Sequence, residues 1–195
     1  MPRSLIIVMG MALCLNLMSC DLFKTRSPEE PSQHSSNYIP PTDPSIVLQN
    51  MVNAFKDGDS FNYGQSFSEA SFNFAPSSNA KSKYVIDWTA WNKQQEKNYF
   101  DKVQTELQNS SQVTLVFTQT SYGIPSDSCD VTTQYQLNVP LKNPGVVKTF
   151  KGLAQFQLVR DSKNGNWSIQ KWIDSDPGST ASDSTWSDLK GAFAQ

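Results

Sequence analysis

Few residues of this sequence have the type and setting needed for catalysis. The one histidine, His34, lies in a segment rich in proline and serine, where we expect a solvated residue and neither a ligand nor a base. Proton transfer near neutral pH would therefore fall to Asp87, Tyr122, Tyr135 or Asp174, retuned by burial. None of these four has a partner that sequence spacing identifies. Asp87 precedes a helical pattern as a cap would, and Asp174 ends a strand pattern as a turn residue would. We predict no catalytic residue.

Metal-dependent and phosphate-dependent chemistry are disfavoured as well. The sequence contains no HExxH, no metal-spaced group of cysteines and histidines, no GxSxG and no phosphate-binding glycine loop. Transition metals prefer imidazole and thiolate ligands, which are scarce here. The formal net charge is −2, with both signs scattered, which is not the pattern of a nucleic-acid-binding surface. We predict no metal, no cofactor and no nucleic-acid partner.

The three cysteines have different expected fates. Residues 5–17, LIIVMGMALCLNL, are almost wholly apolar and follow the single charge of Arg3. As a helix they would span about 20 Å, which is short of a bilayer core of about 30 Å, so they are typical of a secretory signal peptide. Cys14 leaves with that peptide. Cys129 then has no partner for an intramolecular disulfide if Cys20 is modified, and we expect it to be half-buried at a strand edge.

The end of the apolar run resembles the lipobox of bacterial lipoproteins. Leu17-Met18-Ser19-Cys20 has an aliphatic residue three before the cysteine and a small residue just before it, although Met18 departs from the usual small or β-branched residue. The resemblance implies cleavage between Ser19 and Cys20, diacylglycerol on the Cys20 sulfur, and acylation of the freed amine by a fatty acid such as palmitate. Several acyl chains hold a protein stably on a membrane, whereas one chain holds it marginally. An ordinary signal peptide with a cysteine at this place by chance is the alternative.

The residue after the cysteine bears on location. Asp21 resembles the inner-membrane retention signal of enterobacterial lipoproteins, a rule that does not hold in every bacterial phylum. We expect a lipid-anchored protein of the bacterial cell envelope that faces the periplasm, with the inner membrane favoured and the outer membrane left open.

A linker separates the anchor from a folded domain. Residues 21–43, DLFKTRSPEEPSQHSSNYIPPTD, are dominated by proline, serine and charge and have no apolar periodicity. A flexible coil of this length reaches about 25 Å. We therefore predict a signal peptide at 1–19, a lipid-anchored flexible linker at 20–43 and one folded domain at 44–195.

Helical signals fill the first half of that domain. Asp43 and Pro44 are typical of a helix start, apolar residues follow at helical spacing, and Gly58 ends the pattern. A short helix follows Asp59, then a brief strand in SFNFAP, a polar loop at 76–83, and a longer helix over 90–107 capped by Thr89.

The apolar period changes from 3.6 to 2 after Asn109, which predicts an antiparallel meander of four strands over 112–120, 131–139, 146–160 and 166–174. Helices followed by such a sheet give an α+β fold, with N-terminal helices packed on the sheet. One face of the sheet is rich in Thr, Gln and Asn. The inward residues of the other face are expected to be Val113, Leu115, Phe117, Val131, Thr133, Tyr135, Leu137, Val139, Phe150, Ala154, Phe156, Leu158, Trp167, Ile169 and Ile173.

This order of elements resembles the nuclear transport factor 2-like, or ketosteroid-isomerase-like (SnoaL-like), domain. The resemblance covers about 44–174 and includes KDGDSFNY, SFNFAP, a helix led by tryptophan and four long strands. It implies a cystatin-like cone, in which a strongly bent sheet wraps a long helix and leaves a pocket. The stretches AFKDGDSFNYGQSFSEASFNFAP and TWSDLKGAF also resemble a group of uncharacterised bacterial lipoproteins with this fold. Trp186 and Leu189 of the second stretch are expected to dock on the domain as a helical turn.

Two classes of function remain open. One is a non-enzymatic, membrane-anchored module that binds an envelope protein or a small apolar ligand, and this is the class we favour. The other is a lipid-anchored isomerase or lyase that uses a pocket Asp and Tyr. The resemblance also implies that the polar sheet face forms a homodimer, although a merely solvated face fits the sequence equally well. The side chains expected to line a pocket, or else to form core, are Phe55, Tyr63, Phe67, Trp88, Trp91, Tyr135 and Asp174.

Overall fold

The structure, a computed structural model, describes residues 37–108, 112–143, 148–176 and 184–194. The predicted signal peptide, Ser19, Cys20, Asp21 and His34 lie outside the described residues. None of the helices in these ranges is long and apolar enough to cross a bilayer. The elements are α2 (Pro44–Asp57), α3 (Ser60–Gln65), β1 (Asn73–Ala75), α4 (Ser78–Lys83), the 3₁₀ helix η1 (Trp88–Ala90), α5 (Lys93–Thr105), β2 (Thr114–Tyr122), β3 (Ser128–Asn138), β4 (Thr149–Arg160), β5 (Trp167–Ser175) and α6 (Trp186–Phe193).

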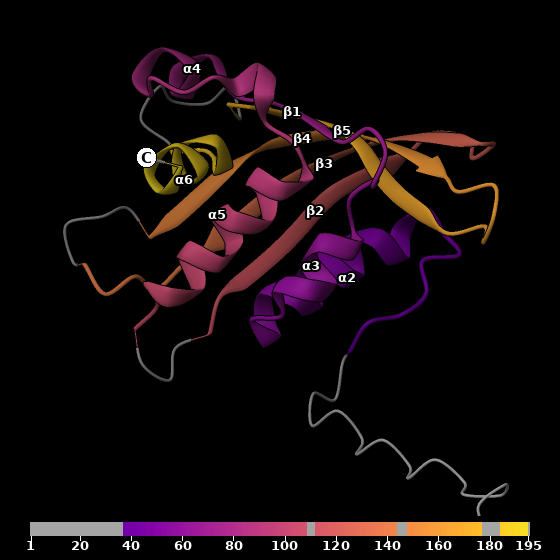
Figure 1. The fold of residues 1–195 in the computed structure, drawn as a ribbon, viewed down its shortest axis with the longest axis horizontal. Helices are drawn as coiled ribbons and strands as arrows, with labels where there is room; N and C mark the ends of the chain where they lie inside the picture. Colours follow the sequence, from indigo (N-terminus) through magenta and orange to yellow (C-terminus); the bar gives the residue numbers. More distant parts are fainter. Residues whose placement is uncertain (1–36, 109–111, 144–147, 177–183, 195) are drawn as a thin grey trace, which may run out of the picture. The chain divides into compact units, whose positions relative to one another are not determined.

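A five-stranded sheet forms one layer of the domain, and helices form the other. The strand order is β1-β5-β4-β3-β2, in which the four long strands make the predicted antiparallel meander and β1 adds a parallel edge beside β5. Figure 1 shows α2, α3 and α5 over one face of the sheet, with α6 beside α5 near one end of β4. The predicted α+β fold is confirmed.

Local capping explains where the first long helix begins and ends. The Asp43 carboxylate accepts a hydrogen bond from the Ser45 N–H at 2.9 Å, and Pro44 occupies the first turn, where it needs no donor. Gly58 ends the helix with φ of 66°, a left-handed conformation that suits glycine.

Two predicted boundaries in the next segment are wrong. The long helix begins at Lys93 rather than at residue 90, because the Asn92 side chain accepts hydrogen bonds from the Gln94 and Gln95 N–H groups and so caps α5 there. Asp87 caps the separate 3₁₀ helix before it, as expected of a capping residue. Residues 76–83 are not simply a loop, since the Ser77 hydroxyl caps the short helix α4.

The inward position predicted for Ile173 is also wrong. Leu158 of β4 pairs with Ile169, whereas the preceding Gln157 pairs with Lys171, so β5 carries one additional residue at this point. The extra residue reverses the alternation along the rest of the strand. Trp172 therefore points into the core with 0% exposure, and Ile173 is half-buried on the other side.

Residues 37–43, which the sequence places in the linker, pack on the domain. The Asn50 side chain accepts a hydrogen bond from the Ile39 N–H at 3.0 Å and donates one to the Ile39 carbonyl at 2.6 Å. The Trp167 N–H donates to the Pro41 carbonyl at 2.7 Å, which ties this segment to the start of β5.

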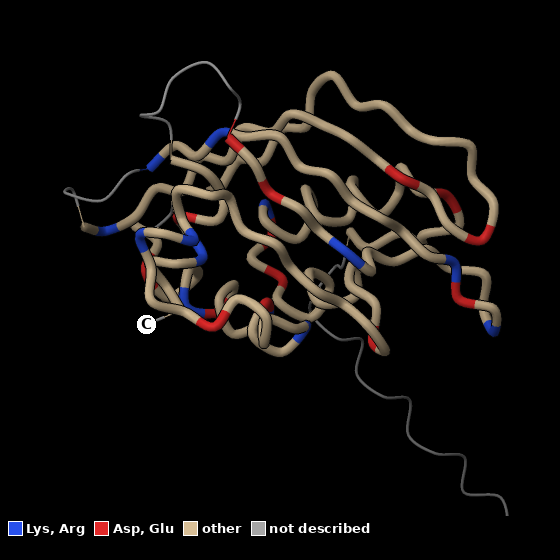
Figure 2. The backbone as a smooth tube through the Cα atoms, turned by 90° about the horizontal axis from the view of Figure 1, so that it is seen from above, with Lys and Arg blue, Asp and Glu red and all other residues tan. Residues whose placement is uncertain are grey.

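The charged residues of the domain are mixed in sign (Figure 2), and its cysteine is buried. Figure 2 shows basic and acidic residues interspersed along the backbone, in keeping with the sequence pattern. Cys129 is buried near the start of β3 rather than half-buried at an edge: the residue pairs with Leu158 of β4, and its thiol contacts the Gly123 carbonyl at 3.6 Å. Burial raises the pKa of its thiol, which disfavours the reactive thiolate.

Candidate functional site

The seven predicted pocket residues come together in the interior, between the helices and the inner face of the sheet. None of them is more than 6% exposed. The Tyr63 ring packs between two phenylalanine rings: its centroid lies 5.2 Å from that of Phe55 and 5.0 Å from that of Phe67. Trp88 and Trp91 stack at 5.3 Å. Tyr122, by contrast, is 42% exposed at the end of β2, so it does not join this group.

Helix α6 fills the space that the cone resemblance assigns to a pocket. The Trp186 side chain is 0% exposed, and its ring centroid lies 4.6 Å from that of Trp172 and 5.2 Å from that of Tyr135. Its indole N–H donates to the Tyr99 hydroxyl at 2.9 Å. Leu189 is buried as well, so the predicted docking of this helical turn is confirmed.

Asp174 and Tyr135 form a buried pair that holds the start of α6. The Tyr135 hydroxyl donates to Asp174 Oδ1 at 2.7 Å and accepts from the Trp186 N–H at 2.7 Å. Asp174 Oδ2 accepts from the Ser187 N–H at 2.7 Å and also from the Ser187 hydroxyl. Asp174 of β5 thus caps the start of α6. The prediction that Asp174 is a turn residue is wrong.

The electrostatics of this pair resemble those of an acid–base site. Burial raises the pKa of Asp174, and the hydrogen bonds from Ser187 and Tyr135 oppose that shift. Burial and the Asp174 charge raise the pKa of Tyr135 well above its usual value. However, the atoms that would face a substrate are already bonded to the backbone and hydroxyl groups at the start of α6.

A second buried group, which the sequence analysis does not identify, lies deeper along α6. Lys190 Nζ donates to Glu96 Oε2 at 2.6 Å, and both side chains are 0% exposed. The Tyr63 hydroxyl donates to Glu96 Oε1 at 2.6 Å, and the Trp91 indole N–H donates to Oε2 at 2.7 Å. The carboxylate therefore has donors from three other side chains, which compensates for its removal from water.

Aromatic rings surround the ammonium group of Lys190. Its Nζ lies 3.6 Å from the ring centroid of Trp172 and 3.7 Å from that of Phe74. The rings of Trp91 and Tyr99 are each 5.7 Å away, within the range of cation–π attraction. Burial lowers the pKa of Lys190 from 10.5 to about 8, with the charges of Glu96 and Asp174 opposing the shift. We call Glu96, Phe74, Trp91, Tyr99 and Trp172 the ammonium cage.

A signal for this pair is present in the sequence. Glu96 precedes Tyr99, Phe100 and Val103 at spacings of three, four and seven, which puts it on the apolar face of its helix. Lys190 follows Trp186 by four positions and precedes Phe193 by three, which likewise puts it on the apolar face of its helix. Opposite charges on the apolar faces of two helices indicate a buried pair.

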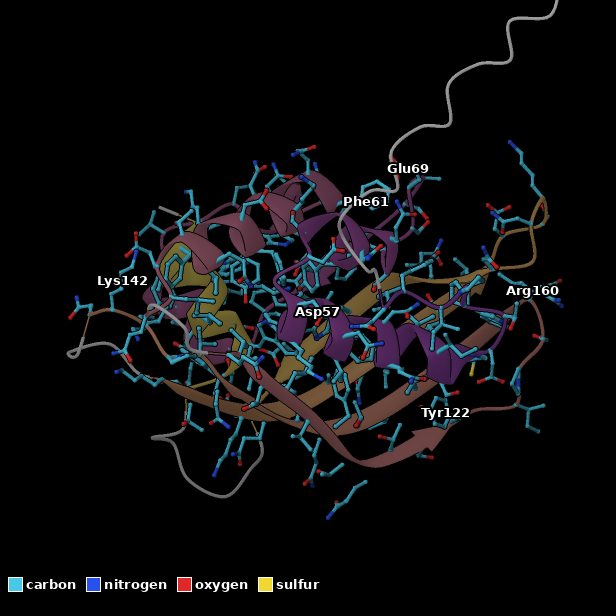
Figure 3. The ribbon with its side chains drawn as sticks, turned by 90° about the horizontal axis from the view of Figure 1, so that it is seen from below. Asp57, Phe61, Glu69, Tyr122, Lys142 and Arg160 are labelled. Atoms are coloured by element: carbon cyan, nitrogen blue, oxygen red, sulfur yellow. The ribbon has the colours of Figure 1, made fainter. Side chains whose placement is uncertain are left out.

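The described surface also holds a groove of about 520 Å³ between α3 and the start of α5. Phe61 and Glu69 line it and lie close together at one edge of the domain in Figure 3. Lys93 pairs with Glu69 across this groove. Within the described ranges, no group of three His, Cys, Asp or Glu side chains could hold a metal ion.

Comparison with known proteins identifies the fold. No family model and no curated protein matches the sequence. A Novosphingobium aromaticivorans protein provisionally named an aromatic ring hydroxylase matches with a TM-score of 0.53 and 14% identity, over 68% of this chain and 85% of that one. A second protein of that species, provisionally named a scytalone dehydratase, matches with a TM-score of 0.53 and 9% identity, over 67% of this chain and 78% of that one. A nuclear transport factor 2-like superfamily protein from Salmonella enterica matches with a TM-score of 0.51 and 13% identity, over 70% of this chain and 89% of that one. The chain has the nuclear transport factor 2-like fold, and identities this low carry the fold alone.

Proposed function

We propose that this protein is a bacterial envelope lipoprotein, anchored by acyl chains on Cys20, whose cone domain binds a ligand or partner and catalyses no reaction. The observation that favours a non-catalytic role is the position of α6. Trp186 and Lys190 of this helix are 0% exposed within the cone. A substrate of an isomerase or lyase would need the volume that these two side chains occupy.

The alternative is a lipid-anchored isomerase or lyase that uses Asp174 and Tyr135. The hydrogen-bonded pair and the provisional names of two structural neighbours favour it. In such an enzyme the pair would face a substrate, whereas here it bonds to Trp186 and Ser187. Amide hydrogen exchange separates the two roles. For a binding module, the Trp186 and Ser187 amides of the unliganded chain should exchange far more slowly than those of an unstructured peptide, because the closed chain holds α6 in the cone. An α6 whose amides are unprotected under native conditions would favour the enzyme.

The anchor is tested by replacing the cysteine of the lipobox. The Cys20→Ala chain should remain uncleaved or become soluble, and should no longer partition into the detergent phase. Cys14→Ala is the matched control, because it changes a cysteine of the same segment outside the box and should leave partitioning unchanged. Detergent-phase partitioning that survives the Cys20 substitution would refute the anchor.

We also propose that two copies associate through the outer face of the sheet. Val116 is 50% exposed there, and Leu153 and Ile173 are half-buried on the same face. Ile173→Lys should halve the mass measured by light scattering. Val85→Lys changes an exposed apolar residue outside the sheet and should leave the mass unchanged. A monomeric native chain at micromolar concentration would contradict the proposal.

A further inference from the structure

The ammonium cage has the composition of a ligand site. It combines one carboxylate oxygen 2.6 Å from the ammonium nitrogen with two aromatic faces centred 3.6 Å and 3.7 Å from it. Proteins recognise ammonium ligands by these two means together, a charge-assisted hydrogen bond and aromatic faces. Here the ligand is a side chain of the same protein.

The cage is assembled without α6. Glu96 and Tyr99 come from α5, Phe74 from β1 and Trp172 from β5, while Trp91 ends η1. The bonds that orient the Glu96 carboxylate come from Tyr63 and Trp91, neither of which belongs to α6. Two of the three donors to the carboxylate would therefore remain if α6 were displaced, and they orient it before a ligand arrives.

Stability alone gives a weak reason for this arrangement. A buried ion pair is often no more stabilising than apolar residues of the same volume, because removing two charges from water offsets their attraction. The rings around Lys190, those of Phe74, Trp91, Tyr99 and Trp172, could equally pack against an apolar residue at position 190. A charged residue there is better explained by recognition.

One of the buried contacts of α6, that of the Lys190 ammonium group, is a contact that a free amine can replace. The buried polar links of α6 are those of Lys190 to Glu96, Trp186 to Tyr99 and Tyr135, and Ser187 to Asp174 and Ser77. A free amine makes the same contacts in the cage as Lys190 does. The lysine is tethered to the same chain, so a free amine must exceed its effective concentration or its affinity.

We propose that the interior of the cone is a binding site for a primary alkylammonium group, which Lys190 occupies in the closed chain and a free primary amine occupies when α6 is displaced. This inference rests on the proposed binding function and names its class of ligand. A primary amine is specified because the group in the cage is one, and because its nitrogen donates to Glu96 Oε2, which a quaternary ammonium group cannot do.

The full-length Lys190→Ala variant tests the site directly. It removes the side-chain atoms beyond Cβ, and n-propylammonium replaces those atoms. The probe should bind with a Kd on the order of 1 mM, raise the thermal midpoint saturably and alter indole fluorescence, because Trp91 and Trp172 line the cage. 1-Propanol, which lacks the charge, and tetramethylammonium, which lacks the donors, should bind at least about tenfold more weakly.

A matched variant distinguishes binding by the ammonium cage from nonspecific filling of a cavity. Lys190→Met fills the space with an apolar side chain of similar length, and n-propylammonium should not stabilise it. The proposal is overturned when a folded Lys190→Ala chain gives no response, or when 1-propanol stabilises it as well as the amine does. In either case the interior is an ordinary cavity.

The native chain provides the measurement when Lys190→Ala does not fold. n-Propylammonium should accelerate amide hydrogen exchange in α6 of the native chain several-fold, whereas 1-propanol and sodium chloride at equal concentration should not. Unchanged α6 exchange overturns the proposal. Neither result bears on membrane partitioning of the Cys20→Ala chain or on α6 exchange without amine, so a failure of this inference is distinguishable from a failure of the proposed function.

Discussion

Gly152 and Tyr135 lie directly opposite each other on β4 and β3, with no room for a methyl group between them. A Cβ atom at position 152 would overlap the Tyr135 hydroxyl group and lie 2.8 Å from the Ser175 carbonyl oxygen. Because Gly152 has no side chain, the Tyr135 hydroxyl has room to lie between Asp174 and the Trp186 N–H.

Gly152→Ala should therefore destabilise the domain by about 1–3 kcal/mol, as overpacking does. The measurement is the free energy of unfolding in urea. Gly64→Ala is the matched control, because a Cβ there meets nothing within 4 Å and replaces glycine in a helix. It should be neutral or stabilise by up to about 1 kcal/mol. Equal losses in the two variants would contradict the close approach of Gly152 to Tyr135.

Removing one charge of the buried pair should be costly. Glu96→Gln leaves the Lys190 ammonium buried beside a neutral amide, and we expect a loss of about 3–5 kcal/mol in the free energy of unfolding. Adding Lys190→Met to that variant should recover much of the loss, because neither charge of the pair remains. Lys97→Met is the control: it breaks an exposed pair with Asp101 and should cost less than about 0.5 kcal/mol. A Glu96→Gln loss as small as this would show that the pair is hydrated.

The low pKa of Lys190 predicts a specific dependence of stability on pH. The folded chain releases this proton near pH 8 and the unfolded chain near 10.5. Between these values the unfolded state binds more protons, so stability attributable to Lys190 rises with pH and is lowest below pH 8. The buried Tyr63, Tyr99 and Tyr135 act in the opposite direction from about pH 10, where unfolded tyrosines ionise first.

The measurement therefore compares the native chain with Lys190→Met from pH 7 to about 9.5, below the tyrosine range. The free energy of unfolding of the native chain should increase relative to that of the variant across this window. Glu96 and Asp174 are the charges that act on Lys190, and both are present in each chain. A difference that stays constant or falls would show that Lys190 titrates normally.

Tyr135→Phe should loosen α6. The change leaves the Trp186 N–H without its acceptor and Asp174 without one donor, at a cost of about 1–3 kcal/mol. Faster hydrogen exchange at the Trp186 amide, together with a lower urea midpoint, would report this. Tyr122→Phe removes a hydroxyl group from an exposed ring and should change stability by less than about 0.5 kcal/mol. Exchange that is unaffected by Tyr135→Phe would contradict the capping role.

The contacts of residues 37–43 predict where the folding unit begins. A chain starting at residue 37 should melt at a higher temperature than one starting at 44, because the shorter chain loses the Pro41 acceptor of the Trp167 N–H and the Ile39 partner of Asn50. Each kcal/mol lost lowers the midpoint by about 2–4 °C at this size. Asn50→Ala in the longer chain should reproduce part of the difference. Equal midpoints would place these residues in the linker.

The sheet was predictable because each long strand is half-buried, and a half-buried strand shows its inner face as a simple alternation. That pattern predicts the inward positions from Val113 to Ile169. It fails at Trp172 and Ile173 because the extra residue of β5 depends on pairing with β4, which the sequence of β5 alone does not contain. Likewise, Thr89 and Asn92 are both acceptable caps, and tertiary packing of Trp88 and Trp91 decides between them.

The interior chemistry was harder to predict, since charged side chains taken one at a time are expected at the surface. Glu96 and Lys190 are buried because each compensates the other, and the two lie 94 positions apart in the chain. Asp174 poses the same problem, because the groups that satisfy it, Tyr135 and Ser187, come from β3 and α6. A charge on an apolar helix face marks Glu96 and Lys190 in the sequence, but the polar groups that surround each of them are identified only when the fold brings distant residues together.

The position of α6 also sets the order of events when the protein is made. This helix follows all five strands in the chain, yet Trp186 packs at the centre of the core, and Ser187 is bonded to Ser77, 110 positions earlier. The core therefore cannot be completed until α6 has been synthesised. Before that point Tyr99, Tyr135 and Asp174 lack the hydrogen-bond partners that α6 provides.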